Sequence, residues 1–418
     1  MEKKKKPEIR FEGFTDDWEQ RKLGIINTFF TDGNYGEAYP KASDMTDSSS
    51  GIPFLTGGNL KEGKLSLDGV SYITPEKHSQ LISGHLLEDD IVIAVRGSLG
   101  ALGYVNTDNS GWNINSQLAI LRTDKSELYG KFLIQYLLSW AGQNELLKRQ
   151  TGSALKQLPI GALKDVEVPI TSVAEQERIA TYFDSLDHLI TLHQRKYEKL
   201  KNVKKSMLEK MFPSKGCKVP EIRFSGFTDD WEQRKLGELA EIVGGGTPST
   251  SVESYWDGDI DWYAPAEIGE QIYLKSSQRK ITEEGLNKSS AKVLPVGTVL
   301  FTSRAGIGKI AILLKEGCTN QGFQSIVPNK DKLDSYFLNY EYQTDKAKKK
   351  IENITTGNTI KHILASDMQE FEVDVPKCKE QKVIASYFCK LDHLITLHQR
   401  KVKILKFIKK LLLEKMLV

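Results

Sequence analysis

The chain has 418 residues, of which 39% are hydrophobic and 27% are charged, and its formal net charge is +3. These values are typical of a globular protein with two or three domains, and the small net charge does not identify a partner. The first residues, MEKKKKPEIRF, lack the apolar core of a signal peptide, and no apolar run reaches membrane-spanning length, so we expect a cytoplasmic protein.

The first predicted element is an opening segment that occurs twice in the chain. Residues 7–24 read PEIRFEGFTDDWEQRKLG, and residues 220–237 differ from them only where Glu12 is replaced by Ser225. Two copies of such a long segment do not form a solenoid, which needs short stacked repeats. The repeat instead predicts two similar domains in tandem.

The regions that follow each opening segment, at about 25–150 and 238–355, are almost unrelated to each other. Both consist mostly of predicted short strands and turns, such as DIVIAV at 90–95, GTVLFTS at 297–303 and KIAILLK at 309–315. A plain duplication would be expected to drift evenly along its length. A copied frame around different inserts therefore indicates one scaffold that presents two different recognition surfaces, although recombination that homogenised the ends remains an alternative.

Glycine-rich strings lie between some of these strands. They are VRGSLG at 95–100 and SRAGIGK at 303–309, and the second resembles a dinucleotide-binding fingerprint. An apolar strand-like run follows it rather than the helix that the fingerprint requires, so a hairpin with glycines at positive φ is favoured. The hairpins would place Arg96 and Arg304 at equivalent strand ends, where a guanidinium can reach a guanine edge or a phosphate. Ser98 and Lys309, in the same two strings, are further candidates for DNA contact.

Amide side chains follow at matching places in the two inserts. NINSQLAIL at 113–121 and CTNQGFQSIV at 318–327 align around one asparagine each. Because asparagine and glutamine can pair bidentately with adenine, these side chains are further candidates, although each alone is also a common turn residue: Asn115, Gln117, Asn320, Gln321 and Gln324. Lys156 and Lys361, after the related strings TGSALK and TGNTIK, suit either a phosphate contact or a plain turn.

Each half ends in a long predicted helix with an apolar seam at alternating spacings of four and three. One seam is Ile179, Phe183, Leu186, Ile190, His193, Tyr197, Leu200, Lys204, Met207 and Met211, and the other is Ile384, Phe388, Leu391, Ile395, His398, Val402, Leu405, Lys409, Leu412 and Met416. This spacing predicts a coiled coil. We expect the two helices to pack against each other in antiparallel fashion, as a rod of roughly 50 Å. The rod would hold two domains about one to one and a half DNA turns apart.

The same helices are basic, because residues 193–218 carry a net +7 and residues 398–418 a net +6. Solvated helix faces explain such runs as well as a contact with phosphates or an acidic partner does.

Several catalytic motifs are absent from the sequence, including a GxxxxGK[ST] loop, the [DNS]PP[FY] motif of amino-methyltransferases and HExxH. Glu62 and Lys64 have the spacing of a nuclease ExK pair, but no convincing aspartate precedes them. The four cysteines form no CxxC pair, so we expect free thiols and no metal site.

A proline-flanked EQxxIAxYF entry, an LDHLITLHQRK helix and a PEIRFxGFTDDWEQRKLG opening, occurring twice around divergent inserts, closely resemble the specificity subunit of bacterial type I restriction-modification enzymes. The resemblance covers essentially the whole chain. It implies a non-catalytic, sequence-specific DNA-binding subunit that reads an asymmetric bipartite target. It also implies that two modification subunits dock on the helices and methylate adenine with S-adenosylmethionine, and that restriction subunits add ATP- and magnesium-dependent cleavage.

The expected fold is α+β, with two mixed α/β target-recognition domains separated by two long antiparallel helices in a pseudo-two-fold arrangement. The expected divisions are 1–170 and 214–376 for the recognition domains and 171–213 and 377–418 for the spacer helices. Two alternatives remain open. One is a coiled-coil scaffold that holds two ligand-binding domains without nucleic acid, and the other is a self-contained nuclease or methyltransferase, which the absent motifs disfavour.

Overall fold

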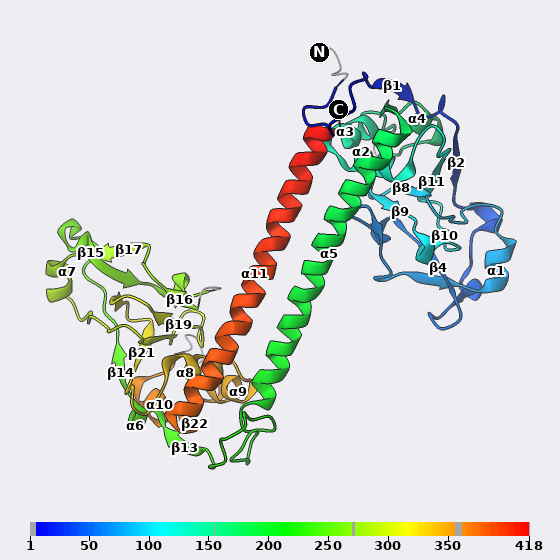
Figure 1. Ribbon diagram of the computed structural model, residues 1–418. Helices are drawn as coiled ribbons and strands as arrows, with labels where there is room; N and C mark the ends of the chain where they lie inside the picture. Colours follow the sequence, from blue (N-terminus) through cyan, green and yellow to red (C-terminus); the bar gives the residue numbers. More distant parts are fainter. Residues whose placement is uncertain (1–5, 154, 270–271, 356–361, 418) are drawn as a thin grey trace. The chain divides into compact units, whose positions relative to one another are not determined.

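The computed structural model of the protein describes four stretches of the chain: residues 6–153, 155–269, 272–355 and 362–417. The chain forms two compact units, namely Met1–Gln194 with Arg400–Val418, and Arg195–Gln399. Two long helices, α5 (Val173–Lys210) and α11 (Cys378–Met416), each contribute to both units (Figure 1). Within the described residues, no helix has both the length and the apolar character needed to cross a membrane.

The first unit is built around an antiparallel sheet in the order β2-β11-β8-β9. Strand β8 is buried along its whole length: Ile91 and Ile93 face one apolar cluster, and Val92 and Ala94 face another. A strand covered on both faces needs a continuous apolar run, and IVIA provides it. The strands are β1 (Glu19–Lys22), β2 (Thr28–Asp32), β3 (Met45–Thr46), β4 (Ile52–Leu55), β5 (Leu60–Lys61), β6 (Lys64–Leu65), β7 (Ser71–Ile73), β8 (Ile91–Ala94), β9 (Leu102–Tyr104), β10 (Asn113–Ile114), β11 (Leu118–Thr123) and β12 (Glu167–Ile170).

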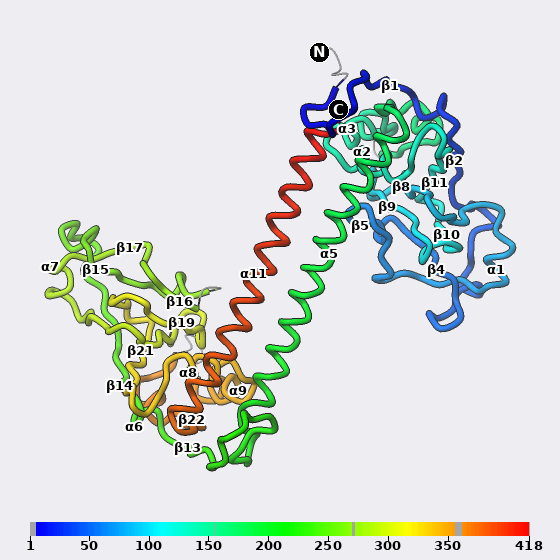
Figure 2. The backbone as a smooth tube through the Cα atoms, viewed as in Figure 1, coloured from blue at the N-terminus to red at the C-terminus, as the bar shows by residue number. Residues whose placement is uncertain are grey.

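The second unit contains a related five-stranded sheet in the order β14-β21-β18-β19-β16. Strand β18 is again buried on both faces, with Val299 and Phe301 in one cluster and Leu300 in another. Figure 2 shows the path of the chain through this unit. The strands are β13 (Glu232–Lys235), β14 (Ala240–Gly244), β15 (Trp256–Tyr263), β16 (Tyr273–Leu274), β17 (Arg279–Ile281), β18 (Val299–Thr302), β19 (Ile310–Leu313), β20 (Cys318–Thr319), β21 (Phe323–Pro328) and β22 (Glu372–Val375).

Short helices also lie in the regions where the sequence pattern indicated mostly strands and turns. In α2, every residue from Phe132 to Leu137 is buried, so the segment lacks the one-sided apolar periodicity by which an amphipathic helix is recognised. The short helices are α1 (Pro75–Gln80), α2 (Gly130–Leu138), α3 (Trp140–Leu147), α4 (Ile160–Lys164), α6 (Leu236–Leu239), α7 (Glu283–Asn287), α8 (Ser335–Glu341), α9 (Asp345–Ile354) and α10 (Ala365–Glu370). The mixed α+β class is confirmed.

The predicted seams of the two long helices are the buried faces of these helices. All twenty seam positions are buried or half-buried. In the first unit, Asp187 of α5 lies 2.7 Å from the ammonium group of Lys409 of α11, and in the second unit Lys204 lies 2.7 Å from Asp392. Because a residue later in α5 pairs with a residue earlier in α11, the helices run antiparallel, as predicted. The two ion pairs are the same contact made twice, since each aspartate and each lysine recurs 205 residues later.

The repeated opening segment joins the start of one long helix to the end of the other. In the first unit, the Arg10 guanidinium donates to both carboxylate oxygens of Glu175 in α5, at 2.6 and 2.7 Å. The neighbouring Ile9 amide donates to the carbonyl of Lys415 in α11 at 3.0 Å, and the Lys415 ammonium pairs with Glu8. The segment therefore ties the two helices together at this end.

The second unit repeats this arrangement with the roles of the helices exchanged. Arg223 donates to both oxygens of Glu380 in α11, at 2.7 and 2.8 Å, and the Ile222 amide donates to the carbonyl of Lys210 in α5 at 2.8 Å. Glu175 and Glu380 are each the first residue of an EQ pair. The near identity of the opening segments and helix entries is thus explained by the structural contacts that they make with each other.

The glutamines of the EQ pairs anchor the recognition domains to the helices. Gln176 accepts a hydrogen bond from the Tyr129 amide at 2.8 Å and donates to the carbonyl of Glu127 at 3.0 Å. Gln381 makes the equivalent bonds with the Asp334 amide and the Lys332 carbonyl. Both glutamines are fully buried. The helix entry and the short helix that follows the central sheet are therefore held in the same relative position in both units.

Candidate nucleic-acid interface

The two glycine-rich strings form hairpin turns, as predicted. Strands β8 and β9 are antiparallel, and so are β18 and β19. The turns contain glycines at φ of 70° and 76° in the first unit, and of 64° and 86° in the second. These are left-handed conformations that glycine adopts without strain. No helix follows either turn, so the resemblance to a dinucleotide fingerprint has no structural basis.

The first hairpin turn carries Arg96 on an exposed surface. Its guanidinium lies 3.4 Å from the Oε1 of Gln157 and 5.4 Å from the ring centre of Tyr35. Ser98 and Gln117 are exposed beside it, and the carbonyl of Gln117 accepts hydrogen bonds from the amides at the end of β8, including that of Arg96 at 3.2 Å. The guanidinium thus contacts Gln157 and Tyr35, the Gln117 carbonyl holds the backbone of the turn, and the arginine side chain remains accessible to a base edge or a phosphate.

The second hairpin turn carries Arg304 and Lys309, both exposed. The buried hydroxyl of Thr302 shapes this turn, because it donates to the carbonyl of Gly306 at 2.6 Å and accepts from the amide of Lys309 at 3.0 Å. Gln321 is exposed and accepts a hydrogen bond from the hydroxyl of Thr247. The second unit therefore also gathers a cation and an amide near the end of a buried central strand, but with different neighbours.

The two aligned asparagines have a structural role in the turns. The Oδ1 of Asn115 accepts from the amide of Gln117 at 3.0 Å, and the Oδ1 of Asn320 accepts from the amide of Gly322 at 2.8 Å. Asn115 is 4% exposed. Gln324 lies within β21, and its Oε1 is buried without a hydrogen-bond partner among the described residues. These three amides are therefore less accessible than Gln117 and Gln321.

The loop after α3 folds back onto the first hairpin. Gln157 pairs with both Thr151 and Arg96 in isolated bridges, and the Leu158 amide donates to the Val95 carbonyl at 2.9 Å. Lys156 is exposed on this loop. In the second unit the Ile363 amide makes the equivalent bond to the Ser303 carbonyl. The other candidate lysine, Lys361, lies outside the described residues.

Two residues beside the arginines and amides were missed from the sequence. Tyr35 is 43% exposed, and its hydroxyl donates to the carbonyl of Ser116 at 3.0 Å. Partial burial, the hydrogen bond with Asp32 and its charge raise the pKa of Tyr35, so it remains a neutral phenol at physiological pH. Thr247 is the other. A tyrosine and a threonine in loops carry no distinctive spacing, and only the fold brings them to the hairpin turns.

The described residues contain no group of three or more His, Cys, Asp or Glu side chains arranged to hold a metal ion. Glu62, half of the weak ExK pattern, lies in the turn between β5 and β6 and pairs with Lys406 of α11. Lys64 donates to the Thr191 hydroxyl at 2.8 Å. Both residues thus join the first unit's domain to its helices. The four cysteines are free, as expected.

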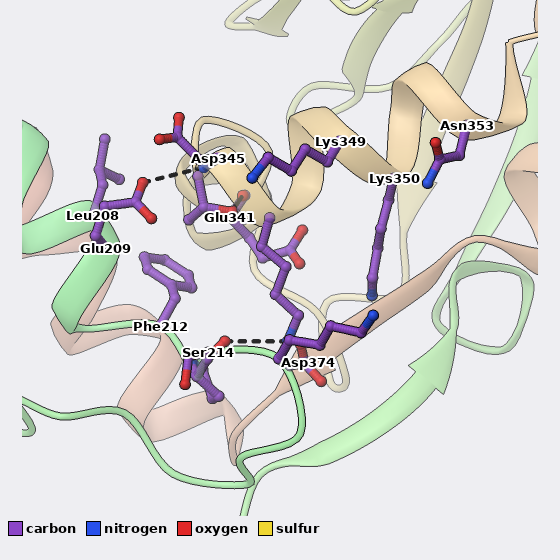
Figure 3. A pocket seen from close by; sticks show the side chains of 14 residues that line it. Leu208, Glu209, Phe212, Ser214, Glu341, Asp345, Lys349, Lys350, Asn353 and Asp374 are labelled. Carbon is purple, nitrogen blue, oxygen red and sulfur yellow. Dashed lines mark hydrogen bonds and ion pairs between the residues drawn. The ribbon is translucent and has the colours of Figure 1, made fainter.

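The second unit also contains a cavity of about 450 Å³ between the end of α5, helix α9 and strand β22. Figure 3 shows Glu341 among its lining side chains, together with Glu209, Lys350 and Asp374. Glu341 is 4% exposed, and its Oε2 has no hydrogen-bond partner among the described residues. Burial raises the pKa of Glu341 to about 8, so its side chain is mostly protonated at neutral pH.

Comparison with known proteins places these features in a family. The family model described as "Type I restriction modification DNA specificity domain" matches residues 15–202 and again residues 228–406. The chain is 37% identical over 179 residues to the type I restriction enzyme MjaIX specificity subunit of Methanocaldococcus jannaschii, an alignment that covers 42% of this chain and 41% of that protein. It is 26% identical over 398 residues to the putative MjaX specificity subunit of the same organism, with 92% and 89% covered.

The fold is shared with solved structures. A type I restriction-modification S subunit from M. genitalium aligns with a TM-score of 0.64 over 99% of both chains, at 14% identity. Because the family model covers most of the chain, once in each repeat, the chain belongs to the type I restriction-modification DNA specificity subunits, which recognise the DNA target and are not the catalytic subunits of these enzymes.

Proposed function

We propose that the chain reads an asymmetric, bipartite DNA target, with one half-site for each recognition domain. The domains would be 1–170 and 214–376, and the helical segments 171–213 and 377–418 would be the spacers. The observation that carries this proposal is that the contacts between the opening segments and the long helices are the same in both units, whereas the exposed residues of the inserts are not. The helix-anchoring contacts of Arg10 with Glu175 recur in the second unit, whereas the exposed surfaces at the two hairpin turns differ.

The side chains that we propose to contact DNA are the exposed residues on and beside these turns. In the first domain they are Arg96, Ser98, Gln117 and Lys156, and in the second they are Arg304, Lys309 and Gln321. An arginine can pair bidentately with the O6 and N7 of guanine, and a glutamine with the N6 and N7 of adenine. Asn115, Asn320 and Gln324 are proposed to support the turns or strands, and Lys361 remains a candidate for a phosphate contact.

We also propose that two modification subunits dock on the basic helices and work in the cytoplasm with this chain. Those subunits would bind S-adenosylmethionine and methylate adenine, while restriction subunits would use ATP and magnesium. The net charges of +7 at residues 193–218 and +6 at residues 398–418 support a docking role for an acidic partner surface, to be met by the lysines and arginines of these segments that are exposed.

Mapping of methylated adenine by long-read sequencing tests the proposal, in a host that expresses this chain with the modification subunit of its own system. We expect an asymmetric motif of two short half-sites separated by unspecified bases. Exchange of residues 25–150 for the insert of a relative should change one half-site, and exchange of residues 238–355 should change only the other. A continuous palindromic motif, or a change of both half-sites by one exchange, would contradict the proposal.

Arginine variants provide a finer test. Binding of the methylating complex to its mapped target should weaken by about 1–3 kcal/mol in Arg96→Ala or Arg304→Ala, and discrimination should relax at one half-site only. Lys156→Ala should weaken binding to all sequences equally and reduce the salt dependence. Fluorescence anisotropy at fixed salt measures these effects. Equal loss of discrimination at both half-sites in either arginine variant would exclude the assignment.

A further inference from the structure

The C-terminal part of α11 carries an exposed apolar stripe that α5 lacks. Its four members are spaced so that they follow one side of the helix: Ile404, Phe407, Ile408 and Leu411. Their exposed fractions are 57%, 68%, 36% and 40%. They lie near the red end of α11 in Figure 1, within the first unit. Exposed apolar groups that are contiguous on one helix face mark an interaction surface.

The stripe is separate from the two faces of α11 that are already covered. At 3.6 residues per turn, it points about 120° away from the seam residues Leu405 and Lys409, which face α5. It also points away from Lys406, which pairs with Glu62 of the recognition domain. No described residue of the first unit therefore needs this face for its own packing.

The internal repeat provides the comparison that makes the stripe informative. At the equivalent positions, 205 residues earlier, α5 carries Lys199, Asn202, Val203 and Ser206. Three of these four are polar or charged. The two helices are otherwise nearly identical around LDHLITLHQRK, so the apolar side chains are a property of α11 alone. A structural requirement common to both repeats does not account for them.

The residues that flank the stripe indicate the chemistry of what covers it. Arg400, Lys401, Lys403 and Lys410 are exposed around it. A helix with an apolar face and acidic margins fits such a surface, since apolar side chains supply the contact area and the opposite charges fix its orientation. We propose that the stripe docks such a helix of one modification subunit, and that the two docking faces of the chain are therefore unequal. The α11 face binds its modification subunit first and more tightly, and the α5 face binds the second more weakly.

This inference rests on the proposed docking of modification subunits, and the following experiment separates the two. The purified full-length chain is titrated with the modification subunit of its own system, and the 1:1 and 2:1 complexes are counted by native mass spectrometry. We expect the 1:1 complex to accumulate well before the 2:1 complex. The second dissociation constant should exceed the first by about tenfold or more beyond the statistical ratio for identical sites, a difference that corresponds to about 1.4 kcal/mol.

Two matched triple variants exchange the faces. I404K/F407N/L411S gives α11 the residues of α5, and it should weaken the first binding step by about tenfold or more. The range of modification-subunit concentrations over which the 1:1 complex dominates should then disappear. K199I/N202F/S206L gives α5 the residues of α11, and it should tighten the second step. All six positions are exposed, so helicity and thermal midpoint should be unchanged, and the single variant Phe407→Asn serves as a milder version.

Statistical filling of two equal sites by the wild type, or a first step that I404K/F407N/L411S leaves unchanged, would overturn the unequal faces while leaving the docking function intact. Self-association of the chain alone that this variant abolishes would instead assign the stripe to a second copy and overturn the proposal. Failure of the wild type to bind any modification subunit would overturn both.

Discussion

Replacement of Glu341 by glutamine isolates the energetic cost of a buried carboxyl group. Glu341 ends α8 beside the cavity of the second unit, and in the first repeat the equivalent residue is Tyr136, whose hydroxyl donates to the Glu167 carbonyl at 3.1 Å. Burial raises the pKa of Glu341 from 4.5 to about 8, an effect that the charges of Lys350 and Lys346 only partly oppose. The unfolded chain ionises this group near pH 4.5, whereas the folded chain keeps it protonated up to about pH 8.

The direction of the pH effect follows from this difference. Between these two pKa values the folded state binds one more proton than the unfolded state, so stability falls as the pH rises. At 1.36 kcal/mol per pH unit, the contribution of Glu341 should destabilise the second unit by about 3 kcal/mol more at pH 8 than at pH 5. Glu341→Gln has no such proton to release, and its stability should therefore lack this part of the pH dependence.

The measurement is denaturant unfolding at pH 5, 6.5 and 8, read by pulsed hydrogen exchange in peptides from α8, so that the second unit is followed separately. Glutamine leaves an amide in the same buried place, which can lower stability at every pH. The quantity to compare between variant and wild type is therefore the slope of the free energy of unfolding against pH, not the free energy of unfolding at any one pH. Glu352→Gln, which removes an exposed carboxylate from neighbouring α9, is the control and should keep the wild-type slope. Parallel curves for Glu341→Gln and wild type would refute the reasoning.

Three other perturbations test individual ion pairs of the structure. Glu175→Gln should lower the free energy of unfolding of the first unit by about 3–5 kcal/mol in denaturant unfolding, because it breaks a buried bidentate pair with Arg10. A loss below about 1 kcal/mol would show that this ion pair does not stabilise the unit. Burial opposes ionisation of Asp261, but hydrogen bonds from Lys315 and nearby serines outweigh it and lower its pKa to about 2. The stability that this carboxylate adds is thus present above about pH 4 and lost as the pH falls toward 2, and Asp261→Asn should flatten that part of an acid titration followed by circular dichroism. In a double-mutant cycle, Asp187→Asn and Lys409→Gln should couple by about 0.5–3 kcal/mol, and additive losses would show that the ion pair adds nothing.

The features that were predictable from the sequence are those whose pattern is local or repeated. The seam from Ile179 to Met211 follows from a spacing that only a long helix buries on one side. The hairpins at Arg96 and Arg304 follow from glycines placed between two apolar runs. The duplication itself was visible as identical strings. In each case the residues that determine the feature lie close together in the chain or occur twice.

The contacts that were not predictable join residues that are distant in sequence. Arg10 and Glu175 are separated by 165 positions, and neither has a neighbouring pattern that identifies the other as its partner. Tyr35 reaches Arg96 only because the central sheet brings two loops together. Asn115 shows a different limit, since an asparagine before a strand fits both a base contact and a turn, and only the observed bond to the Gln117 amide reveals the turn.

The first unit joins two segments that are far apart in the chain, and this has a consequence for biosynthesis. The Ile9 amide binds the Lys415 carbonyl, and Leu413 and Met416 belong to the same apolar core as Trp18. The ribosome must therefore synthesise the chain as far as residue 416 before the first unit can close its core. Until then the nascent amino-terminal half exposes apolar surface, and contacts between residues so distant in sequence form slowly. The half made second, which needs only residues 195–399, is the one that can mature first.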